Sequence, residues 1–321
     1  MSDLAAVADL LEARLPGRVR RAVPSGEFTT YRVGGPFAVV ALVGDDDALA
    51  AIAGVVQAVD VPVLVVGRGS NLLVADAGFD GVAVVLGDEF ERIVIDGEAA
   101  TVLAGGSASL PVLARRAAAA GVSGLEFYVG IPGSVGGAVR MNAGGHGRET
   151  REVLVDVDLL DLRGGARTTR AAGSFDFGYR RSNLDDHTVV CAARFAGSRD
   201  SPEACGERID AIVRWRREHQ PGGANAGSVF SNPPGDSAGR LIDAAGLKGL
   251  RVGGAVVSEK HANFIVADPR ATADDVRALL GEVRMRVEEA TGTCLVTEVR
   301  LIGFGDADSR DLDGPDSQAR R

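Results

Sequence analysis

Residues 121–147 read GVSGLEFYVGIPGSVGGAVRMNAGGHG, and nine of these 27 positions are glycine. Glycine is entropically unfavourable in a helix and Pro132 lacks a backbone donor, so no long helix is expected here. The stretch is too apolar for a solvated linker, because it also carries Leu125, Phe127, Val129, Ile131, Val135, Val139 and Met141. We interpret it as a segment whose backbone closely approaches other backbone or a ligand such as a phosphate; a tightly packed turn is the alternative.

A second glycine loop follows a strand–helix–strand pattern nearer the N-terminus. Residues 37–43 predict a strand, Asp45–Asp47 begin a helix, and residues 61–66 predict a buried strand. The loop Gly67–Leu73 comes at the carboxyl end of that strand, where open α/β sheets place ligands. It matches neither the GxGxxG nor the GxxxxGK(S/T) fingerprint. Two such loops, Gly67–Leu73 here and Gly130–Gly137 within the first stretch, favour a large phosphorylated cofactor, and two ordinary turns remain the alternative.

The remaining chain predicts a sheet-rich middle and a mixed C-terminal part. Expected strands at 82–86, 92–95, 101–104, 153–162 and 187–195, with a helix at 110–120, are typical of an α+β sheet domain. Ser201–Glu203 is a helix start, with an N-cap, a proline and an acid, and the loop 220–227 is a candidate domain crossing. Further expected elements are helices at 238–245 and 273–290 and strands at 255–257, 263–267 and 295–302.

Composition excludes several classes of protein. The chain has 321 residues and a net charge of −9, which disfavours a nucleic-acid-binding protein. It has neither an 18-residue apolar run nor a basic signal sequence, so no membrane insertion is expected. The three cysteines, Cys191, Cys205 and Cys294, form no CxxC pair, which predicts a reducing cytoplasm and neither a disulfide framework nor a metal site. We expect a monomer.

Three further segments carry side chains that are able to do chemistry. Arg180 follows an aromatic residue, where it is either a solvated strand end or a bidentate holder of a carboxylate. Ser228 lies in a small-residue loop without the GxSxG elbow, so it is either an ordinary hydroxyl or a proton donor. Glu298 and Arg300 alternate with apolar residues, either as a surface ion pair or as an acid and an anion clamp facing a cleft.

Together these motifs resemble those of the UDP-N-acetylenolpyruvoylglucosamine reductase family, in its shorter form, from about Thr29 to Gly303. The matching segments occur in the family's order: TTYRVGG at 29–35, GRGSNLL at 67–73, GLEF at 124–127, GIPGSVGGA at 130–138, MNAG at 141–144, YRxS at 179–182, AGSVF at 226–230, KHANF at 260–264 and EVR at 298–300. Single motifs of this length are weak evidence, but their shared order is specific.

The resemblance implies an α+β fold of the vanillyl-alcohol-oxidase (PCMH-type) flavoprotein class. Two subdomains, at 1–88 and 89–198, would bind FAD non-covalently, and a C-terminal domain at 199–305 would bind substrate; residues 306–321 are polar and are expected to be disordered. Implied cofactor contacts are Gly67, Arg68, Gly69, Ser70, Asn71, Leu72, Gly130, Ile131, Pro132, Gly133, Ser134, Gly136 and Gly137.

The resemblance also implies the activity, in which NADPH reduces the flavin and the flavin then reduces an enolpyruvyl UDP-sugar to UDP-N-acetylmuramate for peptidoglycan. Arg180 would hold the substrate carboxylate or enolate, Glu298 would assist it, and Ser228 would donate the proton to C2. Positions implied to bind substrate are Asn232, Lys260, His261, Asn263 and Arg300.

The sequence departs from the family at a few positions, including Ser231, where lysine is frequent, so Arg216, Arg217 or Lys248 would have to compensate in holding the diphosphate. Two other functions remain open at this point. One is a flavin oxidoreductase of the same fold that acts on another sugar or hydroxy acid. The other is a nucleotide-sugar-binding protein with a dead site.

Overall fold

The computed structural model describes residues 3–305, so the predicted tail at 306–321 lies outside the described residues. By contacts the chain forms two compact units. Of the described residues, the first comprises 3–22, 38–68 and 80–218, and the second comprises 23–37, 69–79 and 219–305. The expected division at residue 88 into two FAD-binding subdomains stays a prediction. None of the helices within 3–305 has the length and apolarity needed to cross a bilayer.

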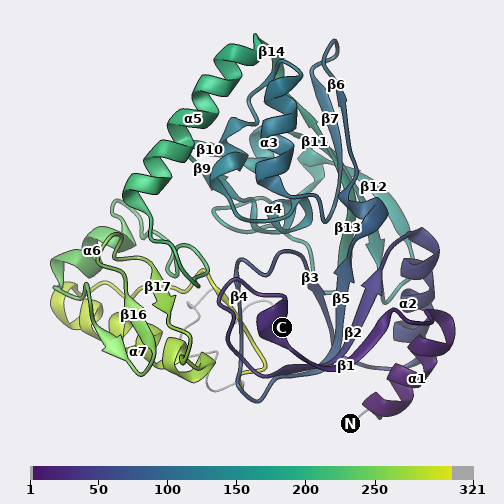
Figure 1. Cartoon of the computed structure of the whole chain (residues 1–321), viewed down its shortest axis with the longest axis horizontal. Helices are drawn as coiled ribbons and strands as arrows, with labels where there is room; N and C mark the ends of the chain where they lie inside the picture. Colours follow the sequence, from purple (N-terminus) through teal and green to yellow (C-terminus); the bar gives the residue numbers. More distant parts are fainter. Residues whose placement is uncertain (1–2, 306–321) are drawn as a thin grey trace. The chain divides into compact units, whose positions relative to one another are not determined.

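One part of the first unit combines two helices with a four-stranded sheet (Figure 1). The strand order is β1-β2-β5-β3, and β3 runs parallel to β5. Asp3 caps the first helix and Asp45 caps the second, each by accepting backbone N–H groups. Apolar side chains from both helices and from the strands share one core. The elements are α1 (Leu4–Arg14), α2 (Asp46–Ala58), β1 (Val19–Pro24), β2 (Pro36–Val43), β3 (Val63–Val66) and β5 (Phe79–Leu86).

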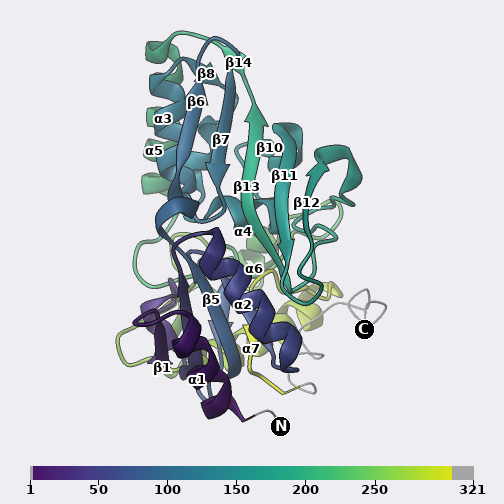
Figure 2. The same ribbon diagram turned by 90° about the vertical axis from the view of Figure 1, so that its right-hand side faces the viewer.

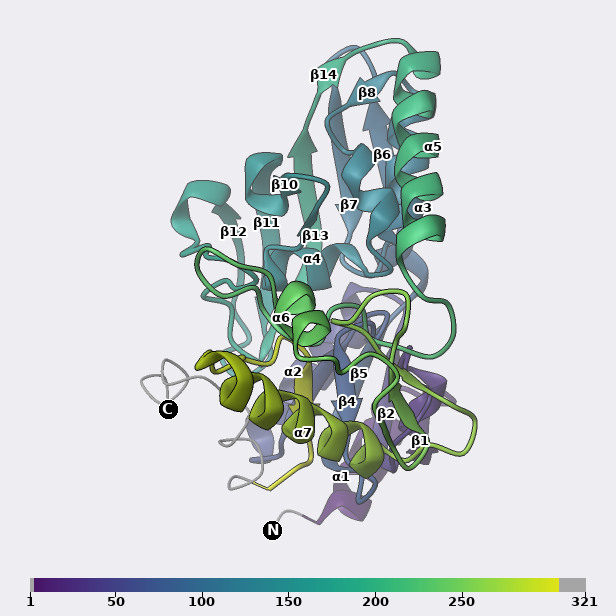
Figure 3. The same cartoon turned by 90° about the vertical axis from the view of Figure 1, so that its left-hand side faces the viewer.

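The other part of the first unit is a five-stranded antiparallel sheet covered on one face by helices (Figure 2). Its strand order is β12-β11-β13-β7-β6, which bears out the α+β expectation for this region. Figure 2 shows α3 and α5 on the same side of this sheet, and Figure 3 shows that side with α5 in front. Side chains of both helices belong to one core. The elements are β6 (Ile93–Asp96), β7 (Thr101–Gly105), β11 (Leu154–Asp161), β12 (Arg167–Ala171), β13 (Thr188–Ala196), α3 (Leu110–Ala119), α4 (Val135–Met141) and α5 (Pro202–His219).

The glycine-rich stretch is more regular than its composition suggests. It contains the short helix α4, which begins inside the predicted loop Gly130–Gly137, so reading that whole segment as a loop is wrong. Ser134 caps this helix by accepting from the N–H of Gly137, and Val135 and Val139 are buried, which offsets the entropic penalty of its glycines. Short elements in and near the stretch are β8 (Val122–Ser123), η3 (Glu126–Gly130), β9 (Gly144–Gly145), β10 (Arg148–Glu149), η4 (Thr150–Glu152) and β14 (Ser198–Arg199).

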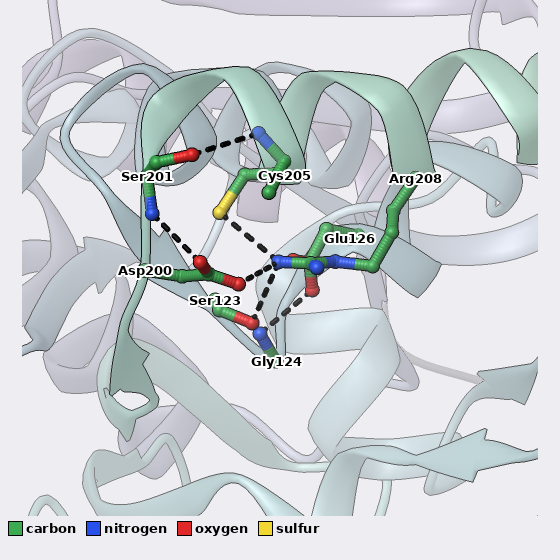
Figure 4. Close-up of polar contacts among 8 residues, drawn as sticks. Ser123, Gly124, Glu126, Asp200, Ser201, Cys205 and Arg208 are labelled. Carbon is green, nitrogen blue, oxygen red and sulfur yellow. Dashed lines mark hydrogen bonds and ion pairs between the residues drawn. The ribbon is translucent and has the colours of Figure 1, made fainter.

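One arginine of α5 ties that helix to the start of the glycine-rich stretch (Figure 4). Arg208 donates to Glu126 at 2.9 Å, to Ser123 at 3.1 Å and to Asp200 at 2.6 Å. The second carboxylate oxygen of Glu126 accepts the N–H of Gly124 at 2.6 Å. This network fixes the entry into the stretch relative to α5.

The second unit packs helices on a small antiparallel sheet of order β15-β16-β17 and adds one parallel pair, β4 with β18. Asp76, just after β4, accepts the N–H groups of Ala273 and Asp274 and so caps α7 across the unit. The predicted strand at 295–302 is only partly correct, since the regular strand begins at Arg300. The elements are β4 (Leu72–Val74), α6 (Ala238–Ala244), β15 (Arg251–Val252), β16 (Ala255–Val257), β17 (Ile265–Ala267), α7 (Ala273–Thr291) and β18 (Arg300–Ile302).

Candidate active site

The two predicted cofactor loops meet within the first unit. A Cβ added to Gly67 would lie 2.3 Å from Oγ of Ser134, the residue that caps α4. Such a separation is far inside van der Waals contact, so only glycine fits at position 67 without displacing that hydroxyl. A Cβ on Gly136 would in turn lie 3.1 Å from the carbonyl oxygen of Gly106. Gly67 therefore lets the first loop approach the Ser134 side chain, and Gly136 lets the glycine-rich stretch approach the backbone of residue 106, the close backbone approach that the sequence predicted.

Residues 69–73 of the first loop belong to the second unit and have their own close contacts. Gly69 has a φ of +59°, and a Cβ there would lie 1.9 Å from the carbonyl oxygen of Phe28. Its own carbonyl accepts the N–H of Thr30 at 3.2 Å. Residues 28–30 therefore pack against this loop and hold it by a hydrogen bond.

Several polar groups of this loop lack a protein partner. Among residues 3–305, no protein acceptor pairs with the backbone N–H groups of residues 68–71. The buried hydroxyl Oγ1 of Thr29, which adjoins Gly69, also has no partner. Free N–H groups and a buried hydroxyl suit the phosphate oxygens and polar atoms of a dinucleotide. The residues present thus fit FAD. Gly67 and Ser134 would hold it in the first unit, and residues 69–71 would do so in the second.

A hydrogen-bonded chain joins this loop to two predicted site residues on the C-terminal segment. Asn71 donates its side-chain amide to the carbonyl of Glu298 at 3.0 Å. The carbonyl of Asn71 accepts the N–H of Arg300 at 3.0 Å, where the parallel β4–β18 pairing begins. Glu298 and Arg300 are both half-buried. The loop and the strand that carries the predicted acid are therefore positioned together.

Ser228 lies next to the same chain of bonds. The carbonyl of its neighbour Val229 accepts the N–H of Glu298 at 2.8 Å, so the loop with Ser228 runs alongside the segment with Glu298. Asn263 fixes that loop, because its amide donates to the carbonyl of Phe230 at 2.8 Å and its side-chain oxygen accepts the Phe230 N–H at 3.0 Å. The buried side chain of Asn263 thus supports the backbone beside Ser228.

The other predicted substrate positions lie around α6 and β16. The side-chain oxygen of Asn232 accepts the N–H of Ala238 at the start of α6. Lys260 is exposed, and its backbone N–H donates to Ser258. Burial lowers the pKa of His261, with smaller contributions from Lys248 and His219, and its Nδ1 accepts the N–H of Asn263. A neutral imidazole at neutral pH follows.

Arg180 lies in the first unit, at the tip of a tight turn rather than at a strand end. Gly178 and Arg181 exchange two backbone hydrogen bonds around Tyr179 and Arg180. Arg180 itself has a φ of +55°, and its guanidinium donates to the carbonyl of Gly144 at 2.9 Å. The glycine-rich stretch therefore holds the predicted carboxylate-binding side chain.

The predicted site residues thus form two groups, one in each unit. The first unit brings Gly67 against Ser134 and ties Arg180 to Gly144. The second unit brings together residues 69–71, the Ser228 loop, Glu298 and Arg300. Sequence reasoning assigned no role to Thr29, although its motif, TTYRVGG, was recognised; a buried hydroxyl beside a glycine loop is visible only in three dimensions.

Comparison with known proteins matches two segments of the chain to known domains. Residues 37–170 match the FAD binding domain, and residues 219–302 match the C-terminal domain of UDP-N-acetylenolpyruvoylglucosamine reductase. The flavoprotein fold class expected from the sequence is therefore confirmed.

Whole-chain relatives agree with these matches. The chain is 44% identical over 303 residues to UDP-N-acetylenolpyruvoylglucosamine reductase of Rhodopseudomonas palustris, covering 94% of this chain and 97% of that protein. It is 43% identical to reductase 2 of Symbiobacterium thermophilum, covering 90% and 94%. The crystal structure of the reductase from Thermus caldophilus is similar, with a TM-score of 0.77 and 38% identity over 89% of this chain and 99% of that one. The chain belongs to the UDP-N-acetylenolpyruvoylglucosamine reductase family.

Proposed function

We infer that this chain reduces UDP-N-acetylenolpyruvoylglucosamine to UDP-N-acetylmuramate, with NADPH as hydride donor and FAD as cofactor, in the synthesis of peptidoglycan precursors. The observation that carries this inference is the connection of residue 71 to Glu298 and Arg300, which joins a cofactor loop to the predicted substrate machinery within a chain of this family. FAD supplies the chemistry of accepting a hydride from NADPH and delivering it to C3 of the enolpyruvyl ether.

Arg180 is assigned to the substrate carboxylate. Hydride addition at C3 places negative charge on an enolate conjugated to that carboxylate, and a guanidinium stabilises such charge through two parallel hydrogen bonds. The turn and the Gly144 contact support this assignment, because they hold the guanidinium in place before substrate arrives. Glu298 is assigned to assist at the same carboxylate or enolate.

Ser228 is assigned as the proton donor to C2. A hydroxyl is a weak acid, but the strongly basic carbon of an enolate is a matching acceptor. Three hydrogen bonds to the backbone of its loop, two with the side chain of Asn263 and one from the N–H of residue 298, support the assignment because they fix the position of the donor. Asn232, Lys260, His261, Asn263 and Arg300 are assigned to bind or support the UDP-sugar.

An anaerobic titration tests the function directly. Purified protein with bound flavin should lose its flavin absorbance on addition of NADPH. It should regain that absorbance without oxygen when UDP-N-acetylenolpyruvoylglucosamine is added. Bleaching without reoxidation by this substrate would instead support an oxidoreductase acting on another sugar or hydroxy acid. A protein without flavin or turnover would support a dead nucleotide-sugar-binding protein.

We further propose that the protein acts as a monomer in the cytoplasm, where NADPH and nucleotide sugars are available, without nucleic-acid or membrane partners. The net charge of −9 supports the absence of a nucleic-acid partner. Light scattering of the holoenzyme at micromolar concentration checks the oligomeric state, with a mass close to 33.1 kDa expected.

A further inference from the structure

Asn142 occupies an unusual place at the end of α4. Its side chain is 0% exposed, and its backbone is left-handed, with a φ of 40°. Asparagine tolerates this conformation better than most residues, but glycine is the commoner choice at a helix C-terminus. A buried amide at such a position needs partners for its hydrogen-bonding groups.

All polar atoms of this amide are paired. Its nitrogen donates to Oε2 of Glu149 at 3.0 Å and to the carbonyl of Gly178 at 3.0 Å. Its oxygen accepts the N–H of Arg151 at 3.0 Å. Only a side-chain amide offers two donors and an acceptor in this arrangement; aspartate of the same size lacks both donors.

One of these partners begins the turn that carries Arg180. Gly178 and Arg181 close that turn through two backbone hydrogen bonds of 3.1 and 3.3 Å. Two residues after Asn142, the carbonyl of Gly144 accepts the Arg180 guanidinium. A single short segment therefore fixes the backbone of the turn at one point and its functional side chain at another.

We propose that Asn142 is a positioning residue for Arg180, acting through the carbonyl of Gly178. The inference rests on the proposed role of Arg180 in the second half-reaction, the reoxidation of the flavin by the enolpyruvyl substrate; the first half-reaction is flavin reduction by NADPH. Without the Asn142 amide, the turn loses the hydrogen bond that fixes its Gly178 carbonyl to the glycine-rich stretch, and the guanidinium no longer sits where negative charge develops.

The test compares the two half-reactions in Asn142→Gly, since glycine adopts the left-handed backbone without strain. Flavin reduction by NADPH should stay within about twofold of the parent, while flavin reoxidation by UDP-N-acetylenolpyruvoylglucosamine should slow about 100-fold, as expected for a misplaced catalytic group. Asn142→Asp, which keeps the size and the bond from Arg151, gives a second measurement should the glycine variant fold poorly.

Ser182→Ala is the matched control. Its hydroxyl donates to the carbonyl of Arg140 at 2.7 Å, so it joins the same two segments without touching Gly178. This variant should lose thermal stability but keep both half-reactions. Equal loss of reoxidation in Ser182→Ala and Asn142→Gly at matched stability would overturn the proposal, because it would show a general structural effect.

A double mutant separates this proposal from the role of Arg180. Arg180→Lys combined with Asn142→Gly should be no slower in reoxidation than Arg180→Lys alone, because the positioned group is already gone. Multiplied losses would contradict positioning. If Arg180→Lys alone reoxidises at the parent rate, the assigned role of Arg180 fails instead.

Discussion

The side-chain amide of Asn71 donates to the backbone carbonyl of Glu298 at 3.0 Å, although 227 positions separate the two residues. The bond lies where β4 and β18 begin to pair in parallel. It sets the segment with the predicted acid against the loop with the unpaired N–H groups. Loss of this hydrogen bond should therefore affect both the cofactor loop that contains Asn71 and the segment that carries Glu298.

Asn71→Ala should weaken FAD binding and the second half-reaction together. It removes a hydrogen bond worth about 1–3 kcal/mol when a half-buried acceptor is left unpaired. Flavin retention after gel filtration and the rate of reoxidation measure the two effects. Gln57→Ala, which removes an exposed amide from α2, is the control and should change neither. Slower reoxidation with full flavin retention would contradict a role of this bond in FAD binding and would leave it only the positioning of Glu298.

Gly69→Ala should destabilise the protein severely. The new methyl group would lie 1.9 Å from the carbonyl oxygen of Phe28, and relieving such a clash in a packed loop costs about 3 kcal/mol or more. Gly17→Ala is the control, since it has a φ of +73° but no atom within 4 Å of the added Cβ. Its penalty should be only the left-handed strain of about 1–2 kcal/mol. Chemical denaturation compares the two, and equal penalties would rule out the close approach.

Glu126→Gln should destabilise the first unit at neutral pH and matter less in acid. Burial alone would raise the pKa of Glu126, but hydrogen bonds from its own N–H, from Arg208 and from Gly124 outweigh burial and lower it. A lowered folded-state pKa adds stability above the ordinary value of 4.5, and that stability is lost as the pH falls through the folded-state pKa. Denaturation at pH 7 and in the acid range should show the difference between parent and variant shrinking. A difference constant with pH would contradict a role for the ionised carboxylate.

Ser228→Ala should separate the two half-reactions. NADPH needs no proton from Ser228 to reduce the flavin, so that step should keep the parent rate. Loss of a positioned acid should slow reoxidation by the enolpyruvyl substrate by about 100- to 10,000-fold. Stopped-flow absorbance under anaerobic conditions follows both steps. Equal loss of both would remove Ser228 from the role of proton donor.

Much of the fold could be predicted from the sequence because its signals are local. The helix now bounded by Ala273–Thr291 shows apolar residues at helical spacing and ends at Gly292, whose left-handed backbone stops it. Pro202 follows a capping serine and opens α5. The glycine loops and the order of short motifs pointed to the flavoprotein family, which the relatives confirm.

The helix α4 could not be predicted from local signals of this kind. Its glycines argue against a helix locally, yet a serine cap and two buried valines stabilise it. The predicted strand at 295–302 was too long for a related reason. Apolar and polar residues alternate from residue 295, but only Arg300–Ile302 pairs regularly with another strand, β4.

The sequence by itself determined which residues are able to bend, cap and approach closely, since these properties belong to single side chains and short periods. Only the tertiary structure decided which of them meet. Gly67 faces Ser134, Asn71 holds Glu298, and Asn142 holds the turn of Arg180. These contacts join residues that are distant in the chain, and hydrogen bonds of that kind depend on how whole elements pack rather than on any local pattern.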